Sequence, residues 1–326
     1  MNIKSEKLFR MFKNIETFTK GYKGMKLINI RVKDRILTTQ ISVGSSTLIQ
    51  TIPVEEDIDF VQTVIQDNSY SKLFAESEQS EIIVTEKMVT MSTETMAIFV
   101  ENKYNEVSIK TFRDLSETKP LHSISFTFTI AFKNLAKDYA TIVDISNNKM
   151  TMLSSVAMLS IYTNYDGPDI QLTMHNFKLL KEFYSQLSNV QMNEESYKFI
   201  GDNMIFICKR KFTDRRKIDS KQVKKICNYK IDTEKLKVLS QFKVDIINLL
   251  INSYYLKYES ITEMTFEQQT DISNYSLKEP MIKLKVNLKY LLDAFSAVNG
   301  REVSLGIYED AYLIIDDSIL LPIIIC

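Results

Sequence analysis

Residues 289–325 read KYLLDAFSAVNGREVSLGIYEDAYLIIDDSILLPIII, a stretch in which a helical pattern gives way to strands. Asn287 is a favourable N-cap for the helix, and Asn299 with Gly300 forms a turn signal. After the turn, β-branched and aromatic residues dominate, as over residues 303–308. The apolar residues that recur at helical spacing are Leu288, Leu291, Leu292 and Phe295. The stretch predicts one short amphipathic helix packed on antiparallel strands.

The same alternation of one short helix with about three β segments occurs six times along the chain. The pattern indicates an α+β protein of three repeated domains, each with two helices packed on antiparallel sheets. We place these domains at residues 1–117, 118–220 and 221–326, because polar, charged stretches surround both boundaries. The predicted helices span residues 4–19, 68–79, 130–138, 176–187, 232–242 and 287–298.

Composition excludes several classes of function. Lys and Arg total 41 and balance 41 Asp and Glu, so no basic excess marks a protein that grips DNA by charge alone. The three cysteines are widely spaced and the two histidines lack spaced ligands nearby, which argues against disulfides and against a zinc site. With seven glycines and no phosphate-binding or nucleophile-elbow motif, the sequence predicts no enzyme and no cofactor.

Three stretches resemble the bacterial sliding clamp, the β subunit of DNA polymerase III. Residues 289–325 are similar to the family's final helix, hairpin and closing strand. Residues 211–218, KFTDRRKI, resemble its R-F-P-D-Y-R-R-V passage between the second and third domains. Residues 122–135, HSISFTFTIAFKNL, resemble the opening strand and helix of its second domain. The resemblance implies three clamp domains per chain, with two chains closing a ring around DNA.

The chain also departs from this family. It is shorter by several loops, as a phage-encoded version would be. Where the family has T-D-G-H-R-L in its partner pocket, residues 154–159 read SSVAML, without the glycine, histidine and arginine. The resemblance therefore implies a more apolar pocket, whose ligand can differ from the usual bacterial peptide.

Basic residues lie on the polar faces or flanks of the predicted helices. In a ring lined by helices, they would screen the phosphates of a threaded duplex without reading its bases. The alternative is an ordinary solvated helix face, and Glu76 and Glu78 fit a DNA-facing role poorly. The predicted DNA-binding residues are Lys7, Arg10, Lys13, Lys72, Lys133, Lys137, Lys178, Lys235, Lys237 and Lys289.

The apolar tail can be either a buried last strand or one wall of a cleft between the second and third domains. By resemblance, such a cleft would hold a short extended peptide of a polymerase or clamp loader through aromatic and aliphatic side chains. The predicted cleft residues are Ser154, Met158, Leu159, Thr213, Ile218, Leu320, Leu321, Pro322 and Ile323.

Residues 88–102, MVTMSTETMAIFVEN, are either an internal strand or an edge strand at a subunit interface. Ala97 and Phe99 match interface positions of the family, so we expect them at the interface of a homodimer.

These observations predict a ring-shaped processivity factor that encircles double-stranded DNA, binds it without sequence specificity and tethers a polymerase. An ATP-driven loader is expected to place it on DNA. The start of the chain lacks a signal-peptide pattern and no apolar run is long enough for a membrane helix, so we expect a cytoplasmic protein, in a bacterial or phage-infected cell. The main alternative is a clamp-fold structural or protein-interaction module that does not encircle DNA, and a dimeric enzyme is a more distant one.

Overall fold

The structure of the chain is a computed structural model. It divides into two compact units, Met1–His122 with Asn176–Arg210, and Ser123–His175 with Lys211–Cys326. The structure describes residues 1–56, 58–75, 77–85, 87–101, 117–121, 124, 134, 137, 141–154, 157–211, 219–230, 240–241, 244–251, 255–260, 265–269, 282–298, 301–316 and 318–324.

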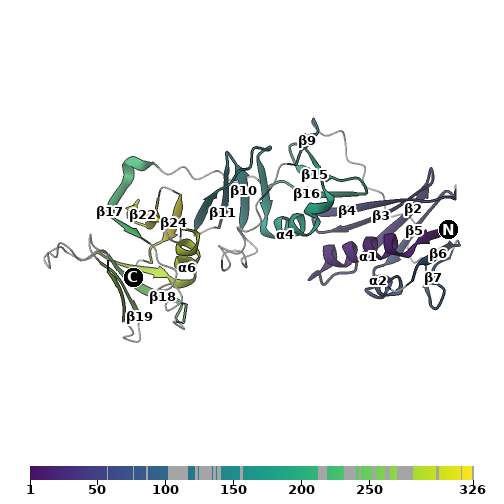
Figure 1. Cartoon of the computed structure of the whole chain (residues 1–326), viewed down its shortest axis with the longest axis horizontal. Coiled ribbons are helices and arrows are strands. Elements are labelled where there is room, and N and C mark those ends of the chain that lie inside the picture. Colours follow the sequence, from purple (N-terminus) through teal and green to yellow (C-terminus); the bar gives the residue numbers. More distant parts are fainter. Residues whose placement is uncertain are drawn as a thin grey trace. The chain divides into compact units, whose positions relative to one another are not determined.

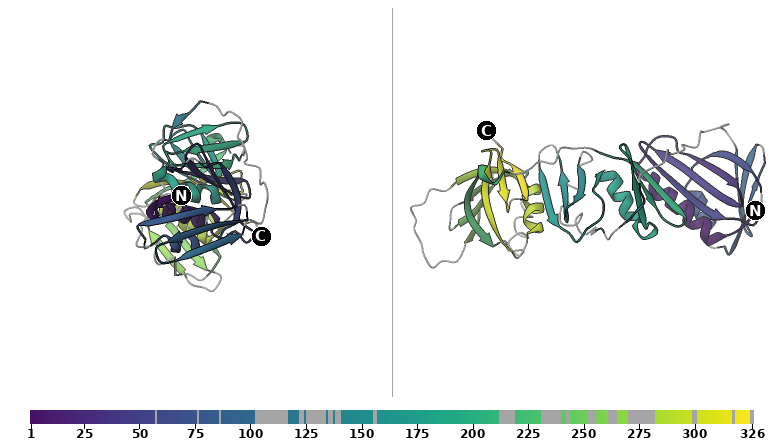
Figure 2. Two further views of the ribbon diagram at one scale, coloured as in Figure 1. Left: turned by 90° about the vertical axis from the view of Figure 1, so that its right-hand side faces the viewer. Right: turned by 90° about the horizontal axis from the view of Figure 1, so that it is seen from above.

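Helix α1 (Ser5–Thr19) is the longest helix of the first unit and follows the short strand β1 (Asn2–Lys4). It packs against helix α2 (Ser69–Leu73) and lies along strands of the larger sheet (Figures 1 and 2). Phe12 joins the two helices, because its ring stacks on Phe74 and meets Tyr70 edge to face. The amphipathic pattern of residues 4–19 therefore produces the expected helix, with its apolar face in the core.

The first unit contains an eight-stranded and a four-stranded antiparallel sheet. The eight-stranded sheet has the order β5-β2-β3-β4-β16-β15-β14-β9, and the four-stranded sheet has the order β1-β6-β7-β8. The strands not yet bounded are β2 (Leu27–Lys33), β3 (Ile36–Val43), β4 (Ser46–Pro53), β5 (Phe60–Ile65), β6 (Gln79–Val84), β7 (Met88–Thr93), β8 (Ala97–Glu101), β9 (Lys119–Pro120), β14 (Asn189–Met192), β15 (Ser196–Ile200) and β16 (Met204–Lys209).

The second unit also contains an eight-stranded sheet, β13-β10-β11-β12-β24-β23-β22-β17, and a four-stranded sheet, β20-β19-β18-β21. Helix α6 (Leu288–Ala297) packs against β21 and β24 (Figure 1). The strands of the second unit are β10 (Ile142–Ser146), β11 (Lys149–Leu153), β12 (Met158–Tyr162), β13 (Ile170–Thr173), β17 (Val223–Lys230), β18 (Ile246–Ile251), β19 (Tyr255–Ser260), β20 (Thr265–Gln269), β21 (Ile282–Asn287), β22 (Glu302–Tyr308), β23 (Tyr312–Ile315) and β24 (Ile319–Pro322). The other helices that the structure describes are α4 (Met174–Phe183) and η2 (Tyr184–Gln186), which lie mainly in the first unit, and η3 (Ser220–Gln222) in the second.

Each eight-stranded sheet consists of two four-stranded halves with different strand orders. In one kind of half, β5-β2-β3-β4 or β13-β10-β11-β12, the third strand in sequence lies at the junction. In the other kind, β9-β14-β15-β16 or β17-β22-β23-β24, the last strand lies there. The junctions are the antiparallel pairs β4–β16 and β12–β24. The two kinds of half are therefore complementary partners.

The four-stranded sheets are one half of each kind. In β21-β18-β19-β20 the third strand in sequence, β20, is at the edge, as β4 and β12 are at their junctions. In β1-β6-β7-β8 the last strand, β8, is at the edge, as β16 and β24 are at theirs. Among the described residues, β8 and β20 each pair with one strand only.

Several sequence predictions change in the structure. The helix predicted at residues 68–79 ends at Leu73, because the following residues lead into β6, which pairs with β1. The single strand predicted at residues 88–102 is a hairpin of β7 and β8. Asn287 caps α6 as predicted, accepting hydrogen bonds from the backbone N–H groups of Lys289 and Tyr290. The helices predicted at residues 130–138 and 232–242 lie almost wholly outside the described residues.

The three-domain division stays a prediction. The residues of the predicted second domain, 118–220, contribute strands to both units. Strands β10–β13 join the sheet of the second unit through the pair β12–β24, while β14–β16 join the sheet of the first unit through the pair β16–β4. Of the helices that the structure describes, none is long and apolar enough to cross a membrane.

Candidate functional site

The basic face of α1, which we define as Lys7, Arg10 and Lys13, lies opposite its buried side. Leu8, Phe12 and Ile15 are almost completely buried, whereas Lys7, Arg10 and Lys13 are exposed. Residues three apart on a helix share one side, so the three cations form one row.

Acidic neighbours moderate this charge. Arg10 pairs with Glu6 at 3.1 Å and Lys13 with Glu16 at 3.0 Å. Exposed pairs of this kind contribute about 0.2–1 kcal/mol, so either cation can exchange its partner for another anion at small cost. Lys7 makes no ion pair within the described part of the chain, and its ammonium group is the most available of the three.

The other predicted DNA-binding residues that the structure describes are also exposed. They are Lys72 on α2, Lys137, Lys178 on α4 and Lys289 on α6. Lys289 Nζ pairs with Asp245 Oδ1 at 2.6 Å. Lys133, Lys235 and Lys237 lie outside the described residues.

One exposed basic segment was missed at the sequence level. Residues 20–25, KGYKGM, follow α1 directly, and all six are exposed. They add Lys20 and Lys23 to the end of the row on α1, next to the exposed ring of Tyr22. The composition of this segment, basic and aromatic residues between glycines, could have indicated a loop that contacts nucleic acid.

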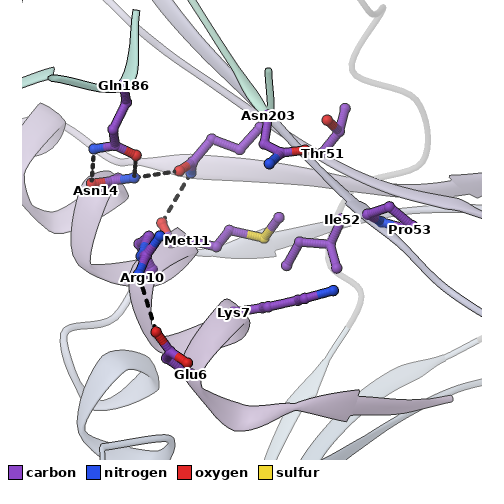
Figure 3. A pocket seen from close by; sticks show the side chains of 11 residues that line it. Glu6, Lys7, Arg10, Met11, Asn14, Thr51, Ile52, Pro53, Gln186 and Asn203 are labelled. Carbon is purple, nitrogen blue, oxygen red and sulfur yellow. Dashed lines mark hydrogen bonds and ion pairs between the residues drawn. The ribbon is translucent and has the colours of Figure 1, made fainter. Parts of the chain in front are cut away.

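A pocket of about 270 Å³ opens beside the basic face of α1 (Figure 3). Figure 3 shows Met11 and Ile52 in its middle, with Lys7 on one side and Asn203 on the other. The full lining is Glu6, Lys7, Arg10, Met11, Asn14, Gln50, Thr51, Ile52, Pro53, Gln186 and Asn203. All of these residues belong to the first unit.

Three carboxamides close one end of this pocket. The Asn14 side-chain nitrogen donates to Gln50 Oε1 at 2.8 Å and to Gln186 Oε1 at 3.2 Å, and Gln50 Nε2 donates to the Met11 carbonyl oxygen at 2.9 Å (Figure 3). Gln50 is almost completely buried, so these bonds also satisfy a polar group withdrawn from water. The network fixes these three carboxamides in place.

The predicted partner cleft coincides in part with an apolar cluster on the eight-stranded sheet of the second unit. We call it the β24 cluster: Met158, Tyr308, Ile314 and Leu320, with Leu153, Val223 and Tyr312 packed against it. Met158 and Leu320 are direct partners across the β12–β24 junction, and Ile314 is the partner of Leu320 on β23. Two predicted cleft residues are thus brought together.

Their neighbours point the other way. Side chains alternate along a strand, so Leu159 and Leu321 lie on the opposite face of the sheet from Met158 and Leu320. The side chains on both faces are buried: Leu159, Leu320 and Leu321 almost completely, and Met158 with 8% exposed. Pro322 and Ile323 are half-buried at the end of β24, and Ile323 bridges to Val286.

Ser154 lies in the turn before β12, where its hydroxyl accepts a hydrogen bond from the Ala157 N–H. The predicted cleft residues Thr213 and Ile218 lie outside the described residues.

Glycine shapes the β24 cluster. Gly306 pairs with Ile314 on β23. A Cβ at this position would lie 2.9 Å from the Lys224 carbonyl oxygen, 3.0 Å from Val223 Cγ1 and 3.2 Å from Ile314 Cγ2, closer than ordinary contacts. The absence of a side chain at Gly306 therefore lets the side chains of Val223 and Ile314 pack close to the backbone of β22.

The predicted interface residues lie on the edge strand β8. Ala97 and Phe99 point to the same face, and the Phe99 side chain is 66% exposed. Ile98 and Val100, on the other face, are partly buried. An exposed aromatic residue on an unpaired strand edge is the pattern of a surface that pairs with another strand.

The described residues offer little for covalent or metal chemistry. Burial raises the pKa of the Cys227 thiol to about 11, and it raises that of Cys208 as well, so neither is a thiolate at neutral pH. Within the described part of the chain, no three His, Cys, Asp or Glu side chains group as metal ligands would.

Comparison with solved structures identifies the fold. A DNA polymerase sliding clamp from Pseudomonas aeruginosa superposes with a TM-score of 0.73 at 11% identity, over 100% of this chain and 99% of that one. The chain has the fold of the bacterial β sliding clamps. The Helicobacter pylori β clamp bound to a DNA ligase peptide gives 0.70 at 14% identity, and the same clamp with diflunisal gives 0.72 at 13%. These cover 100% of this chain and 99% and 100% of theirs. No protein-family model and no curated protein matches the sequence.

The clamp fold confirms the predicted α+β class with antiparallel sheets. It also gives one motif residue a structural role. Asp293, in the stretch that resembles the final clamp helix, is buried and accepts two hydrogen bonds from Asn134, one from its N–H at 2.8 Å and one from its side-chain amide at 3.0 Å. Within this clamp fold, Asp293 therefore anchors a residue 159 positions away.

Proposed function

We propose that the protein is a DNA sliding clamp, in which two chains pair head to tail and close a ring around duplex DNA. The observation that carries this proposal is the pair of complementary sheet edges. The half that ends in β8 and the half that ends in β20 are of the two kinds that join at β4–β16 and β12–β24.

Pairing of β8 with β20 of a second chain would complete the same eight-stranded sheet between molecules. The two edges differ, so the contact is head to tail, and such contacts form rings when the rotation closes. Two chains would then give six eight-stranded sheets, and both exposed edges would be covered.

The mechanism is topological. A closed ring cannot leave a duplex sideways, so its residence time depends on ring opening and not on the strength of its contacts. The basic face of α1 and Lys72, Lys137, Lys178 and Lys289 would contact phosphates without reading bases. Weak contacts suit this role, because the ion pairs of Arg10, Lys13 and Lys289 keep the cations partly neutralised. No bond is made or broken by the protein.

The β24 cluster is the proposed docking site for a partner peptide. The Helicobacter pylori clamp binds a DNA ligase peptide, and here a polymerase and a loader would be the ligands. Ile323, which is half-buried, and Met158, which is 8% exposed, are the contact candidates, whereas Leu159, Leu320 and Leu321 are almost completely buried and support the strand. Tethering through this site holds the polymerase near its primer at high effective concentration.

Retention on DNA tests the proposal. The purified chain is diluted until it is monomeric, mixed with circular plasmid and concentrated, so that two chains can close around the DNA without the expected loader. Glutaraldehyde then crosslinks the dimers, and a wash at high salt removes contacts that depend on charge alone. The crosslinked dimer should stay on the circle and be released when the plasmid is linearised.

Equal retention on circular and linear DNA would contradict encirclement. A crosslinked dimer that never stays on the circle would also contradict it, and would favour a clamp-fold module that binds proteins only.

A further inference from the structure

The pocket beside α1 has the size and chemistry of a small-ligand site, and it shares only Lys7 and Arg10 with the proposed DNA-contacting residues. Its volume of about 270 Å³ lies near the lower end of such sites, which are typically about 300–1,000 Å³. It is too small for a folded partner or for duplex DNA, and it suits a ligand of the size of a single nucleotide.

The lining places charge and apolar surface in different parts of the pocket. Lys7 and Arg10 lie on α1 at one side, while Met11 and Ile52 form a buried apolar floor (Figure 3). The Glu6 carboxylate pairs with Arg10, and Lys7 has no ion-pair partner among the described residues. A ligand that fits both parts carries an anionic group for Lys7 and a flat or apolar body for the floor.

Hydrogen-bonding groups are available beyond the floor. The Asn14, Gln50 and Gln186 carboxamides bond to one another and so form a fixed polar wall. The exposed side chain of Asn203, on the turn before β16, makes no hydrogen bond within the part of the chain that the structure describes. A carboxamide offers a donor and an acceptor side by side, the arrangement that matches the edge of a nucleobase.

An extended peptide fits this site less well. Peptides of that kind gain affinity by hydrogen bonding to a free strand edge. β4 is paired with β3 along its whole length, and on its other side it is bonded to β16 and to Asn203 as far as Thr51. Only Ile52 and Pro53 remain on that side, too few to continue a ladder.

We infer that this pocket binds a nucleotide, with its phosphate at Lys7 and Arg10, its base over Met11 and Ile52, and the base edge at Asn203. The nucleotide can be free or the end of a single DNA strand, since both present the same phosphate and base. The inference goes beyond the proposed clamp function and requires neither a ring nor a loader.

Calorimetric titration of the full-length protein with dAMP tests the site. We expect saturable binding in the micromolar to millimolar range, weakened about tenfold by Lys7→Ala through loss of the charged contact, and about tenfold by Asn203→Ala. Both residues are exposed, so neither variant should disturb folding. Lys181→Ala, which removes an exposed cation of α4 outside the pocket, is the matched control and should bind normally.

Three further arms separate the alternatives. Deoxyribose 5-phosphate, which lacks the base, should bind more weakly than dAMP, and equal binding would overturn the base contact. A 5′-phosphorylated single-stranded oligonucleotide that binds more tightly than dAMP identifies a strand end as the occupant, and weaker binding identifies a free nucleotide.

Absence of dAMP binding at millimolar concentration, or equal binding by the wild type and both pocket variants, would overturn the site. Either result would leave retention on circular DNA untouched, so failure of this site is distinguishable from failure of the clamp function.

Discussion

Replacing Phe99 should weaken the dimer strongly. The side chain is 66% exposed on the edge strand β8. A Phe side chain buries roughly 200 Å² when fully covered, so up to about 130 Å² would be removed from water at each interface. At about 25 cal/mol per Å² this gives about 3 kcal/mol. A ring of two chains has two such interfaces, and about 6 kcal/mol corresponds to roughly four orders of magnitude in the dissociation constant of the dimer.

Sedimentation velocity over a range of protein concentrations measures this change. Phe99→Ala should approach that loss as an upper value, and Phe99→Asp should give monomer, because it also places a charge in a desolvated contact. Tyr162→Ala is the matched control, since Tyr162 is an aromatic residue 71% exposed on β12, a strand that pairs with β11 and β24 inside an eight-stranded sheet. An unchanged dimer in both Phe99 variants would refute the assignment of β8 to the interface.

The end of β24, the basic face of α1 and the buried Tyr70 each give a further prediction. Ile323→Asp should abolish calorimetric binding of a peptide that carries one Leu and one Phe, while dimerisation is kept; Leu321→Ala, on the core side of β24, should instead cost about 2–5 kcal/mol of stability in a urea titration. Normal peptide binding by the Ile323 variant would show that the partner docks elsewhere. Replacing the basic face of α1 by alanines should make the plot of log DNA-binding constant against log salt concentration less steep, by about 0.9 for each of the three lost phosphate contacts. An unchanged slope would show that α1 does not contact DNA. The Tyr70 hydroxyl donates to the Ile65 carbonyl oxygen at 2.6 Å, and burial raises the pKa of Tyr70 from 10.0 to about 12, so its contribution to stability is present below pH 10 and is lost as the pH rises to about 12. Tyr70→Phe should therefore cost about 1 kcal/mol of stability at neutral pH and flatten the decline of stability at alkaline pH. Parallel profiles of unfolding free energy against pH for the two proteins would contradict this expectation.

Local patterns predicted the elements whose periodicity is clear. The apolar face of α1 and the Asn287 cap of α6 follow directly from spacing and residue type. The pattern of residues 88–102 predicts one strand, because β-forming residues continue through the turn and Glu94 and Thr95 are weak turn signals. The helix predicted at residues 68–79 stops early because pairing of β6 with β1 outweighs helical propensity.

The β24 cluster and the pocket beside α1 depend on strand register and on long-range contacts, which the spacing of residues in the sequence does not show. Leu320 and Leu321 are equally apolar, and only the register of β24 against β12 shows which of them joins the apolar cluster. The contact of Asp293 with Asn134 and the pocket wall of Asn14 and Gln186 join residues more than a hundred positions apart. No periodicity in the sequence indicates such contacts.

Electron microscopy of the purified full-length protein, at a concentration where the dimer predominates, tests head-to-tail closure most directly. Head-to-tail closure predicts closed rings of two chains, each with a central hole wide enough for a DNA duplex, and loss of these rings in the Phe99→Asp variant. Dimers without a hole, or open pairs in which one β8 edge remains unpaired, would contradict it.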